Sequence, residues 1–277
     1  MEERIAWDEL PDTLRKSIEA RTGPITTAHT ATAGENSPLA ATVRTAKTTT
    51  FVKGLPTGHR RAITQAREAA VAPLVRGISP TLRWSFEENG WNVLGYEFVH
   101  GRHADYRPGS RDLDGIVLLM TVLGHIEVGP GEAALFKRAE DRWKSYVDDP
   151  ATALLFSGTT LTHTDWAPHN VLVAPDRVWL IDWAWPTLGA AWTDPAHWVI
   201  RLIAAGHTPR DAERQAARLP AFATADPTHL DAFATANVRL WDEIEQADAG
   251  TRTWTATMAE AARSWAAYRK TPSGGHR

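Results

Sequence analysis

The amino-acid pattern changes near residue 100, and this change limits the folds that the chain can adopt. Before it, short runs rich in Thr and other β-branched residues are separated by turn formers, as in antiparallel strands. After it, apolar residues recur at helical spacing over longer segments. Strands followed by helices favour an α+β fold. With 277 residues, the chain has room for one large domain or two smaller ones.

The first part of the chain predicts an antiparallel sheet with one helix. Turn-forming triplets such as Glu88-Asn89-Gly90 separate the apolar runs. A segment with repeated alanines between the third and fourth runs has helical character. The expected strands are 24–32, 39–45, 48–52, 82–86 and 91–99, and the expected helix is 59–75.

The second part predicts a helical lobe with one irregular insertion. Its helical segments are 110–126, 132–147, 192–205, 208–217, 227–247 and 251–268. Within this part, a polar loop over residues 160–170 precedes apolar runs at 171–173 and 178–181, which we interpret as small strands. We therefore predict an N-terminal part over 1–95, a connection over 96–101 and a helical C-terminal part over 102–277.

The composition favours a globular protein of the cytoplasm. The chain has no cysteine, which excludes disulfides and thiolate metal sites and favours a reducing compartment. The first residues lack the apolar core of a signal peptide, and the longest apolar run, 116–123, is too short to span a membrane. The net charge of -3 gives no general attraction to nucleic acid. We therefore expect neither a membrane nor a nucleic-acid partner.

Three polar side chains stand at a spacing that suits phosphoryl transfer. Asp165 lies in the segment His163-Thr-Asp-Trp-Ala-Pro-His-Asn170, and Asp182 follows the next predicted strands. An Asp in such a loop can orient a hydroxyl group, and an Asn and a second Asp can hold metal ions between phosphates. Two simpler interpretations remain open: His163 and His169 could belong to a metal-hydrolase site, and the carboxylates could cap turns.

This segment resembles the catalytic loop and metal motif of the protein-kinase-like fold, and most of all the aminoglycoside phosphotransferase family. In that family the loop reads His-Gly-Asp with four residues before Asn, and the later motif matches Ile181-Asp182-Trp183. The stretch Gly189-Ala-Ala-Trp-Thr-Asp194-Pro is also similar, whereas Thr164 replaces the family's Gly. The resemblance implies a two-lobed fold with an antiparallel sheet of five strands plus a helix, a mostly helical second lobe, and a ligand cleft between the lobes.

The resemblance also implies the chemistry of the loop. Asp165 is expected to be the catalytic base or the residue that orients the hydroxyl group, and His163 is expected to brace the loop. Asn170 and Asp182 are expected to hold magnesium. The implied cofactors are ATP, with GTP as an option, and Mg²⁺.

Further residues of the first lobe match the family's nucleotide site. Lys53 is expected to contact the α and β phosphates, and Glu68 to pair with Lys53. The backbone of Glu97 and Val99 is expected to receive the adenine. The turn from Gly34 to Ser37 is expected to cover the phosphates with its N–H groups. Lys53 as a solvated edge-strand residue and Glu68 as an exposed helix residue remain open alternatives.

The acceptor site is the least constrained part of the sequence. Trp166 and Trp185, together with Trp183, stand inside or beside the catalytic loop and could form a stacking wall for a substrate, although most tryptophans are core residues. An acidic stretch contains Asp242, Glu243 and Glu245. These carboxylates could line an anionic wall for a polycationic substrate, or they could belong to a solvated helix face.

These features predict an ATP-dependent O-phosphotransferase that acts on a small hydroxylated molecule. The leading acceptor is a cationic, aminoglycoside-type antibiotic, whose phosphorylation would confer resistance. The first alternative is a kinase of a sugar, a choline-like compound or an amino-alcohol metabolite. The second is a nucleotide-binding regulator without turnover, and a nucleic-acid-binding module based on the arginines between residues 60 and 83 is the third. The acceptor's identity and the choice between a monomer and a dimer are not determined by the sequence.

Overall fold

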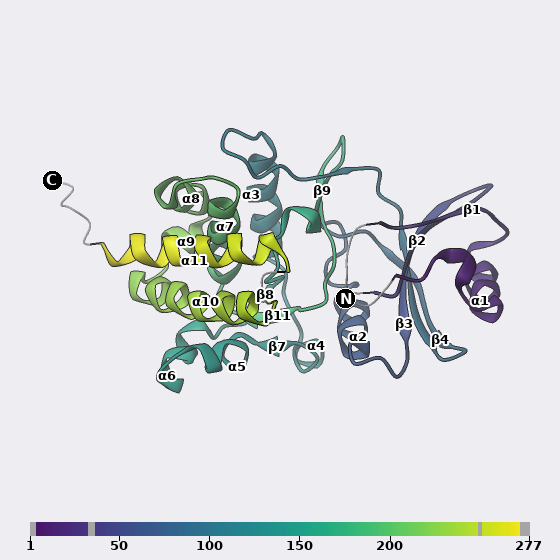
Figure 1. Cartoon of the computed structure of the whole chain (residues 1–277), viewed down its shortest axis with the longest axis horizontal. Coiled ribbons are helices and arrows are strands. Elements are labelled where there is room, and N and C mark those ends of the chain that lie inside the picture. The colour runs from purple at the N-terminus through teal and green to yellow at the C-terminus, as the bar shows by residue number, and fades with distance from the viewer. Residues whose placement is uncertain (1–3, 33–36, 249–250, 272–277) are drawn as a thin grey trace. The chain divides into compact units, whose positions relative to one another are not determined.

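A computed structural model describes residues 4–32, 37–248 and 251–271, and it divides the chain into two compact units (Figure 1). The first unit contains residues 1–101 and 181–184, and the second contains residues 102–180 and 185–277. The chain therefore enters the second unit at residue 102, returns to the first for the four residues 181–184, and enters the second again at residue 185. Among the described residues, no helix is long and apolar enough to cross a membrane.

The first unit is built on an antiparallel sheet of five strands, as expected. The strand order is β1-β2-β3-β5-β4, and every neighbouring pair is antiparallel. Figure 1 shows helices α1 and α2 on opposite sides of this sheet. The elements are β1 (Ile25–Thr30), β2 (Leu39–Thr45), β3 (Thr49–Pro56), α2 (Ala62–Val71), β4 (Leu82–Glu88) and β5 (Trp91–Glu97).

An N-terminal helix that the sequence analysis did not predict covers one face of the sheet. Helix α1 (Asp12–Thr22) follows a short 3-10 turn at Trp7–Glu9. Leu14 and Ile18 of α1 have no exposed surface and share one core with Val43, Val52 and other strand residues. Because side chains alternate along a strand, the residue after Val52 belongs to the opposite face, where α2 packs. That residue is Lys53.

The second unit is mostly helical. Its core contains large side chains that are at most 1% exposed, among them Trp143, Phe156, Trp198, Phe233 and Trp265. Its α-helices are α3 (Asp112–Leu123), α4 (Pro130–Ala133), α5 (Ala139–Trp143), α6 (Pro150–Ala153), α7 (Thr193–Ala204), α8 (Pro209–Ala216), α9 (Pro220–Ala223), α10 (Pro227–Ala247) and α11 (Thr253–Lys270). Short 3-10 helices lie at Lys144–Tyr146, Leu154–Phe156 and Pro168–Asn170.

The single helix predicted over 132–147 is wrong. Helix α4 ends at Ala133, strand β7 follows at Lys137–Arg138, and α5 begins at Ala139. Strand β7 pairs in parallel with β11 (Thr187–Gly189), a partner about fifty residues away in sequence. Such a long-range pairing overrides the local helical preference of the segment, and the hydrophobic pattern alone does not reveal it.

Two small sheets in the second unit hold the polar loop of the sequence motif. One contains β10 (Val178–Leu180), β9 (Val171–Val173) and β6 (Arg102–His103), and the other contains β7, β11 and β8 (Thr160–Thr162). The loop with Asp165 therefore connects β8 to β9, and Asp182 is the second residue after β10. Each carboxylate lies within three residues of the end of a strand, which anchors the backbone on one side.

Candidate functional site

The loop around Asp165 is anchored by a buried carboxylate from the first turn of α7. Asp194 accepts hydrogen bonds from the backbone N–H groups of His163 and Thr164, each at 2.8 Å. Burial raises the pKa of Asp194, and the donated backbone hydrogen bonds oppose this rise. The Asp194 side chain thus fixes the two residues that precede Asp165.

Thr164 explains how the loop tolerates a residue other than glycine. Its backbone has φ 67, a left-handed conformation that costs a residue with a side chain about 1 kcal/mol or more. Its hydroxyl oxygen lies 2.6 Å from Nη1 of Arg142 and 3.3 Å from the carbonyl oxygen of Trp185, so it makes contacts that a glycine lacks. These hydrogen bonds offset part of the backbone strain.

His163 and Asn170 close the loop from inside. Both are buried. Nδ1 of His163 accepts a hydrogen bond from the backbone N–H of Asp165 at 3.3 Å, which is the bracing contact expected of this histidine. Nδ2 of Asn170 donates to the backbone carbonyl of Asp165 at 3.1 Å. Since the amide nitrogen is engaged in this way, the amide oxygen of Asn170 is the atom that suits a cation.

The carboxylate of Asp165 has a charged partner that the sequence analysis missed. Nη2 of Arg201 lies 2.7 Å from Oδ1 of Asp165, and the Asp165 side chain is 37% exposed. Arg201 is itself held by a contact to the sulfur of Met258 and by the ring of Trp241. One feature of the sequence pointed to Arg201: it lies seven residues after Asp194, and this interval places both residues on one face of a helix.

Replacing Arg201 tests whether this ion pair orients Asp165. For Arg201→Gln we expect kcat to fall roughly 10-fold, because one hydrogen bond between charged groups contributes about 1.5 kcal/mol. The KM for ATP should stay unchanged, and Arg201→Lys should recover part of the loss. Steady-state kinetics measures both parameters. An unchanged kcat in Arg201→Gln would show that the pair has no part in turnover.

In the first unit, three ionisable side chains form a compact cluster. Nζ of Lys53 lies 2.8 Å from Oε2 of Glu68 and 2.6 Å from Oδ1 of Asp182. The phenol of Tyr96 donates to the other oxygen of Glu68 at 3.1 Å. The expected pairing of Lys53 with Glu68 is therefore present, because α2 packs on the face of the sheet to which Lys53 belongs. Its role in nucleotide binding stays a prediction.

The electrostatics of this cluster keep the lysine charged. Burial by itself lowers the pKa of Lys53, but the neighbouring charges of Asp182 and Glu68 raise it overall. Burial raises the pKa of Glu68, against the opposing effect of Lys53. The lysine side chain is 13% exposed. A fixed cation between two carboxylates is suited to a site that binds both phosphate groups and a divalent metal ion.

The residue after Asp182 anchors the returning segment in the first unit. Trp183 is buried, and its Nε1 donates a 2.6 Å hydrogen bond to Oγ of Ser79. Asp182 itself has φ 64, a left-handed conformation that turns the chain beside Lys53. Trp183 is therefore a packing residue in this structure and does not form a stacking wall for a substrate.

The remaining nucleotide-site predictions have different outcomes. Ser37 is buried, whereas residues 34–36 of the expected phosphate-covering turn lie outside the described residues. The N–H of Glu97 donates to the carbonyl of Thr81 at 2.9 Å, so it is not available to adenine. The carbonyl of Glu97 and the backbone of Val99 stay as predicted contacts.

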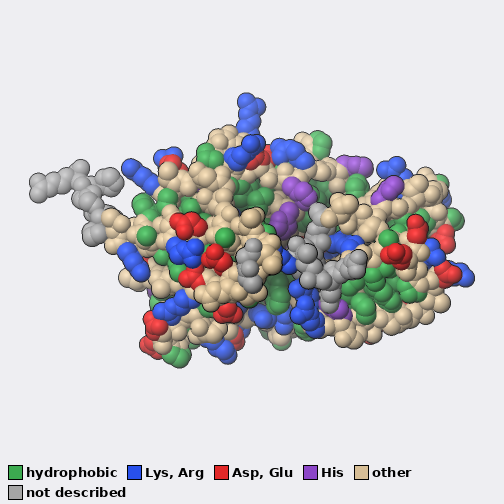
Figure 2. Space-filling model, viewed as in Figure 1, with side chains coloured by type: hydrophobic (Ala, Val, Ile, Leu, Met, Phe, Trp, Pro, Cys, Tyr) green, Lys and Arg blue, Asp and Glu red, His purple; other side chains and the backbone are tan. Residues whose placement is uncertain are grey.

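The predicted acceptor residues separate into buried and exposed ones. Trp166 has no exposed surface and lies edge-on to His163, so it belongs to the core and does not form part of a stacking wall. Trp185 is 37% exposed. Among the acidic residues, Asp242 and Glu245 both pair with Arg263 from α11, at 2.6 and 3.4 Å. Figure 2 shows acidic and basic side chains intermixed over α10 and α11.

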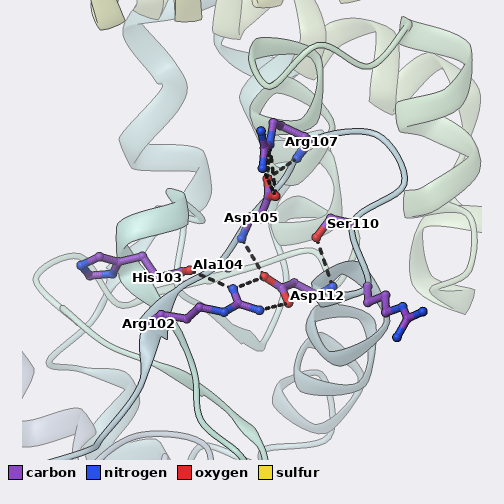
Figure 3. A pocket seen from close by; sticks show the side chains of 8 residues that line it. Arg102, His103, Ala104, Asp105, Arg107, Ser110 and Asp112 are labelled. Atoms are coloured by element: carbon purple, nitrogen blue, oxygen red, sulfur yellow. Dashed lines mark hydrogen bonds and ion pairs between the residues drawn. The ribbon is translucent and has the colours of Figure 1, made fainter.

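A surface pocket of about 600 Å³ lies at the start of α3, apart from the motif residues (Figure 3). Two of its arginines pair with its two aspartates. Arg102 makes two hydrogen bonds to Asp112, at 2.6 and 2.7 Å, and Arg107 folds onto Asp105. The backbone N–H of Asp105 also donates to Asp112. We interpret the pocket as an electrostatic clasp that secures the segment before α3.

This clasp predicts a defined loss of stability in acid. Hydrogen bonds from Arg107 lower the pKa of Asp105 to about 2, and hydrogen bonds from Arg102 lower the pKa of Asp112. A carboxyl group with a lowered pKa stabilises the fold above its ordinary pKa and loses this effect as the pH falls toward the lowered value. The destabilisation caused by Arg102→Gln should therefore shrink as the pH falls below about 4, the ordinary pKa of an aspartate. Denaturant unfolding at several pH values measures it, and a pH-independent difference would contradict the prediction.

Comparison with known proteins finds relatives in structure only. Neither a protein-family sequence model nor the sequence of a curated protein matches the chain. The fold does match solved structures. Choline kinase LicA from Streptococcus pneumoniae superposes with a TM-score of 0.62 at 13% identity, over 93% of this chain and 99% of that one. A thermostable mutant of aminoglycoside phosphotransferase APH(4)-Ia, solved with AMP-PNP and hygromycin B, gives a TM-score of 0.61 at 13% identity, over 96% of this chain and 100% of that one.

The chain has the fold of these small-molecule kinases. At such low identity the likeness establishes the fold and not the activity. Both similar proteins are covered almost completely, so the likeness extends over both units of this chain. Another solved structure of LicA contains AMP. The prediction of a kinase-like α+β fold is confirmed.

Proposed function

We propose that the protein is an ATP-dependent O-phosphotransferase that acts on a hydroxyl group of a small molecule. The observation that carries this proposal is the contact of Lys53 with both Glu68 and Asp182, since Asp182 lies 129 residues from Lys53 in the sequence. The anchored loop around Asp165 supplies the second half of the expected chemistry. The fold shared with a choline kinase and an aminoglycoside phosphotransferase supports the same class of reaction.

The residues present suit a magnesium-bound nucleotide. Among residues 4–32, 37–248 and 251–271, no group of three or more His, Cys, Asp and Glu side chains is placed to hold a metal ion. Magnesium in a phosphoryl-transfer site requires no such group, because it binds one or two protein oxygens together with phosphate oxygens and water. We assign these protein oxygens to Asp182 and Asn170. Magnesium neutralises the charge of the phosphates when it is bound.

Each protein residue then has one task in the transfer. Lys53 binds phosphate oxygens, and Glu68 keeps Lys53 in place. Asp165 accepts a hydrogen bond from the acceptor hydroxyl, which orients its oxygen toward the γ-phosphorus and gives the proton a destination. The new bond joins the acceptor oxygen to phosphorus, while the bond to the β-phosphate oxygen breaks and ADP leaves with its electrons.

The ion pairs of the acidic residues bear on which class of acceptor we propose. An aminoglycoside requires anionic groups, but Asp242 and Glu245 share Arg263, so a polycationic substrate would have to compete with this arginine. This observation favours a small hydroxylated metabolite over an aminoglycoside, which remains the second candidate. Resistance would follow only in the second case.

Transfer of radiolabelled γ-phosphate tests the proposal directly. The protein is incubated with Mg²⁺ and labelled ATP or GTP, and with a mixed library of antibiotics, sugars, amino alcohols and hydroxy acids. A labelled product that forms with the wild type and not with Asp165→Ala supports the proposal. Nucleotide binding without transfer to any acceptor would instead favour a regulator without turnover.

A further inference from the structure

Arg142 of α5 connects the loop of Asp165 to the segment that follows residue 184. Its Nη1 lies 2.6 Å from the hydroxyl oxygen of Thr164, 3.2 Å from the carbonyl oxygen of Trp185 and 3.0 Å from the hydroxyl oxygen of Thr187. All of these residues belong to the second unit. We call Arg142, Thr164, Trp185 and Thr187 the Arg142 junction.

The two threonine hydroxyls complete the junction. Each accepts a hydrogen bond from Arg142 and donates one to the carbonyl of Trp185, Thr164 at 3.3 Å and Thr187 at 2.9 Å. A hydroxyl can do both because it has one hydrogen and two lone pairs. Both threonines are buried. Since a buried hydroxyl that loses its partner costs free energy, the hydrogen bonds of the junction hold its members in one arrangement.

Two aromatic rings flank the guanidinium group of Arg142. Its central carbon lies 5.0 Å from the centre of the Trp143 ring and 5.6 Å from that of Trp185. A guanidinium group can contact aromatic faces while its edge donates hydrogen bonds, because it is planar. Trp143 is 1% exposed and belongs to the core of the second unit. The core therefore fixes Arg142 on one side, and the junction fixes it on the other.

Thr164 is the point at which the junction reaches the loop of Asp165. Its backbone N–H is held by Asp194, and its hydroxyl is held by Arg142. Its φ of 67 is left-handed, so the preference of a threonine backbone alone does not keep this conformation. The next residue is Asp165, and a change in the backbone of Thr164 would redirect it. The contacts of the Thr164 side chain therefore bear on the direction of the Asp165 carboxylate.

Building on the proposed phosphotransferase function, we infer that Arg142 is a positioning residue for Asp165 and that it acts through the hydroxyl of Thr164. Arg142 keeps Thr164 in its left-handed conformation, and this conformation directs the Asp165 carboxylate toward the acceptor hydroxyl. Arg142 itself takes no part in making or breaking a bond. Its loss should lower turnover without weakening ATP binding, because a misplaced carboxylate slows the transfer and leaves the nucleotide site unchanged.

Variants of Thr164 separate its hydroxyl from its backbone. Thr164→Ser keeps the hydroxyl and Thr164→Ala removes it, while both keep a β-carbon at the left-handed position. We expect Thr164→Ala to lower kcat roughly 10-fold, the effect of one hydrogen bond to a charged group, and Thr164→Ser to retain most of the turnover. The KM for ATP should stay close to the wild-type value in both. Phosphate release from ATP measures turnover with water in place of the acceptor hydroxyl, so the assay does not require a known acceptor.

Two double-mutant cycles show how Arg142 acts. Arg142→Gln alone should lower kcat by a similar factor, and it should lower kcat by less in the Thr164→Ala protein, where the shared hydrogen bond is already absent. In the Asp165→Asn protein, Thr164→Ala should cause no further loss, because a positioning residue acts only through the group that it positions. A merely structural role would lower the thermal stability and would give neither coupling.

Arg239→Gln is the matched control for Arg142→Gln. Arg239 also donates to one backbone carbonyl and one side-chain oxygen, those of Tyr146 and Asp148, at 3.2 and 2.7 Å. Both of these residues lie outside the loop of Asp165. We expect kcat of Arg239→Gln to stay at the wild-type value. Thermal unfolding of each variant sets the temperature at which all of them are folded and can be compared.

Two results would overturn the inference and leave the proposed function intact. One is a Thr164→Ala protein that turns over ATP as fast as the wild type. The other is a loss of kcat in Arg142→Gln that is equally large with and without the Thr164 hydroxyl. A wild type that neither hydrolyses ATP in the presence of magnesium nor transfers phosphate to any acceptor would instead contradict the proposed function, and the inference with it.

Discussion

Asp165→Ala is expected to lower kcat by about 10²-fold or more, the scale of a general-base contribution, while the affinity for ATP stays close to that of the wild type. The physical reason is that His163, Asn170 and Asp194 hold the backbone of the loop, while the Asp165 carboxylate stays 37% exposed beside Arg201. Removing the carboxylate therefore removes the hydroxyl acceptor without dismantling the loop. Steady-state kinetics with the acceptor found in the transfer assay measures the effect.

Two controls make this result decisive. Asp165→Asn keeps the size of the side chain and removes its charge, so it should lose nearly as much turnover as Asp165→Ala. Asp176→Asn alters an exposed carboxylate that also pairs with an arginine, Arg177, and should leave kcat unchanged. Thermal unfolding verifies that each variant is folded. A kcat of Asp165→Ala near the wild-type value would refute the role of this residue.

The features that could be predicted from the sequence are those with a local periodic signal. Alternating residues and turn formers predicted the five strands, and the same alternation explains why Lys53 meets a helix while Val52 meets the core. The helices after residue 180 could be predicted for a similar reason, since α10 and α11 have long, regular patterns of apolar residues at helical spacing. The spacing of Asp165, Asn170 and Asp182 added a chemical signal to this local one.

What could not be predicted depends on contacts between distant segments. Helix α1 has few apolar residues, and its stability comes from packing against the sheet, which the local pattern does not show. The pairing of β7 with β11 breaks an otherwise helical stretch. The partner of Asp165 is similar: Arg201 lies thirty-six residues away, and its interval from Asp194 indicates a shared helix face but not that this face meets the loop.

The tryptophans show a second limit of sequence reasoning. Proximity to Asp165 and Asp182 in the chain suggested that Trp166, Trp183 and Trp185 share one role. The structure separates the three residues. Trp166 and Trp183 are buried, and Trp183 donates a hydrogen bond to Ser79. Only Trp185 reaches the surface, and there it is accompanied by cations. Adjacent positions in a loop point in different directions, so adjacency alone does not define a binding wall.

Asp182→Ala is expected to abolish the magnesium-dependent part of nucleotide binding. The carboxylate oxygens of Asp182 are the oxygens that we assign to the metal ion, and the neutral amide of Asn170 alone is a weak magnesium ligand. Isothermal titration calorimetry with ATP in the presence and absence of Mg²⁺ measures the difference. The wild type should bind more tightly with the metal, whereas the affinity of the variant should not depend on it.

The variant should remain folded, because its charges stay balanced. Lys53 keeps Glu68 as a partner at 2.8 Å after Asp182 is removed, so no buried cation is left alone. Lys53→Ala is the informative contrast: it leaves the buried Glu68 without a cation, so we expect a lower thermal stability as well as weaker ATP binding. Metal-dependent ATP binding that survives in a folded Asp182→Ala protein would show that the ion is held elsewhere, because the substitution removes the assigned carboxylate and little else.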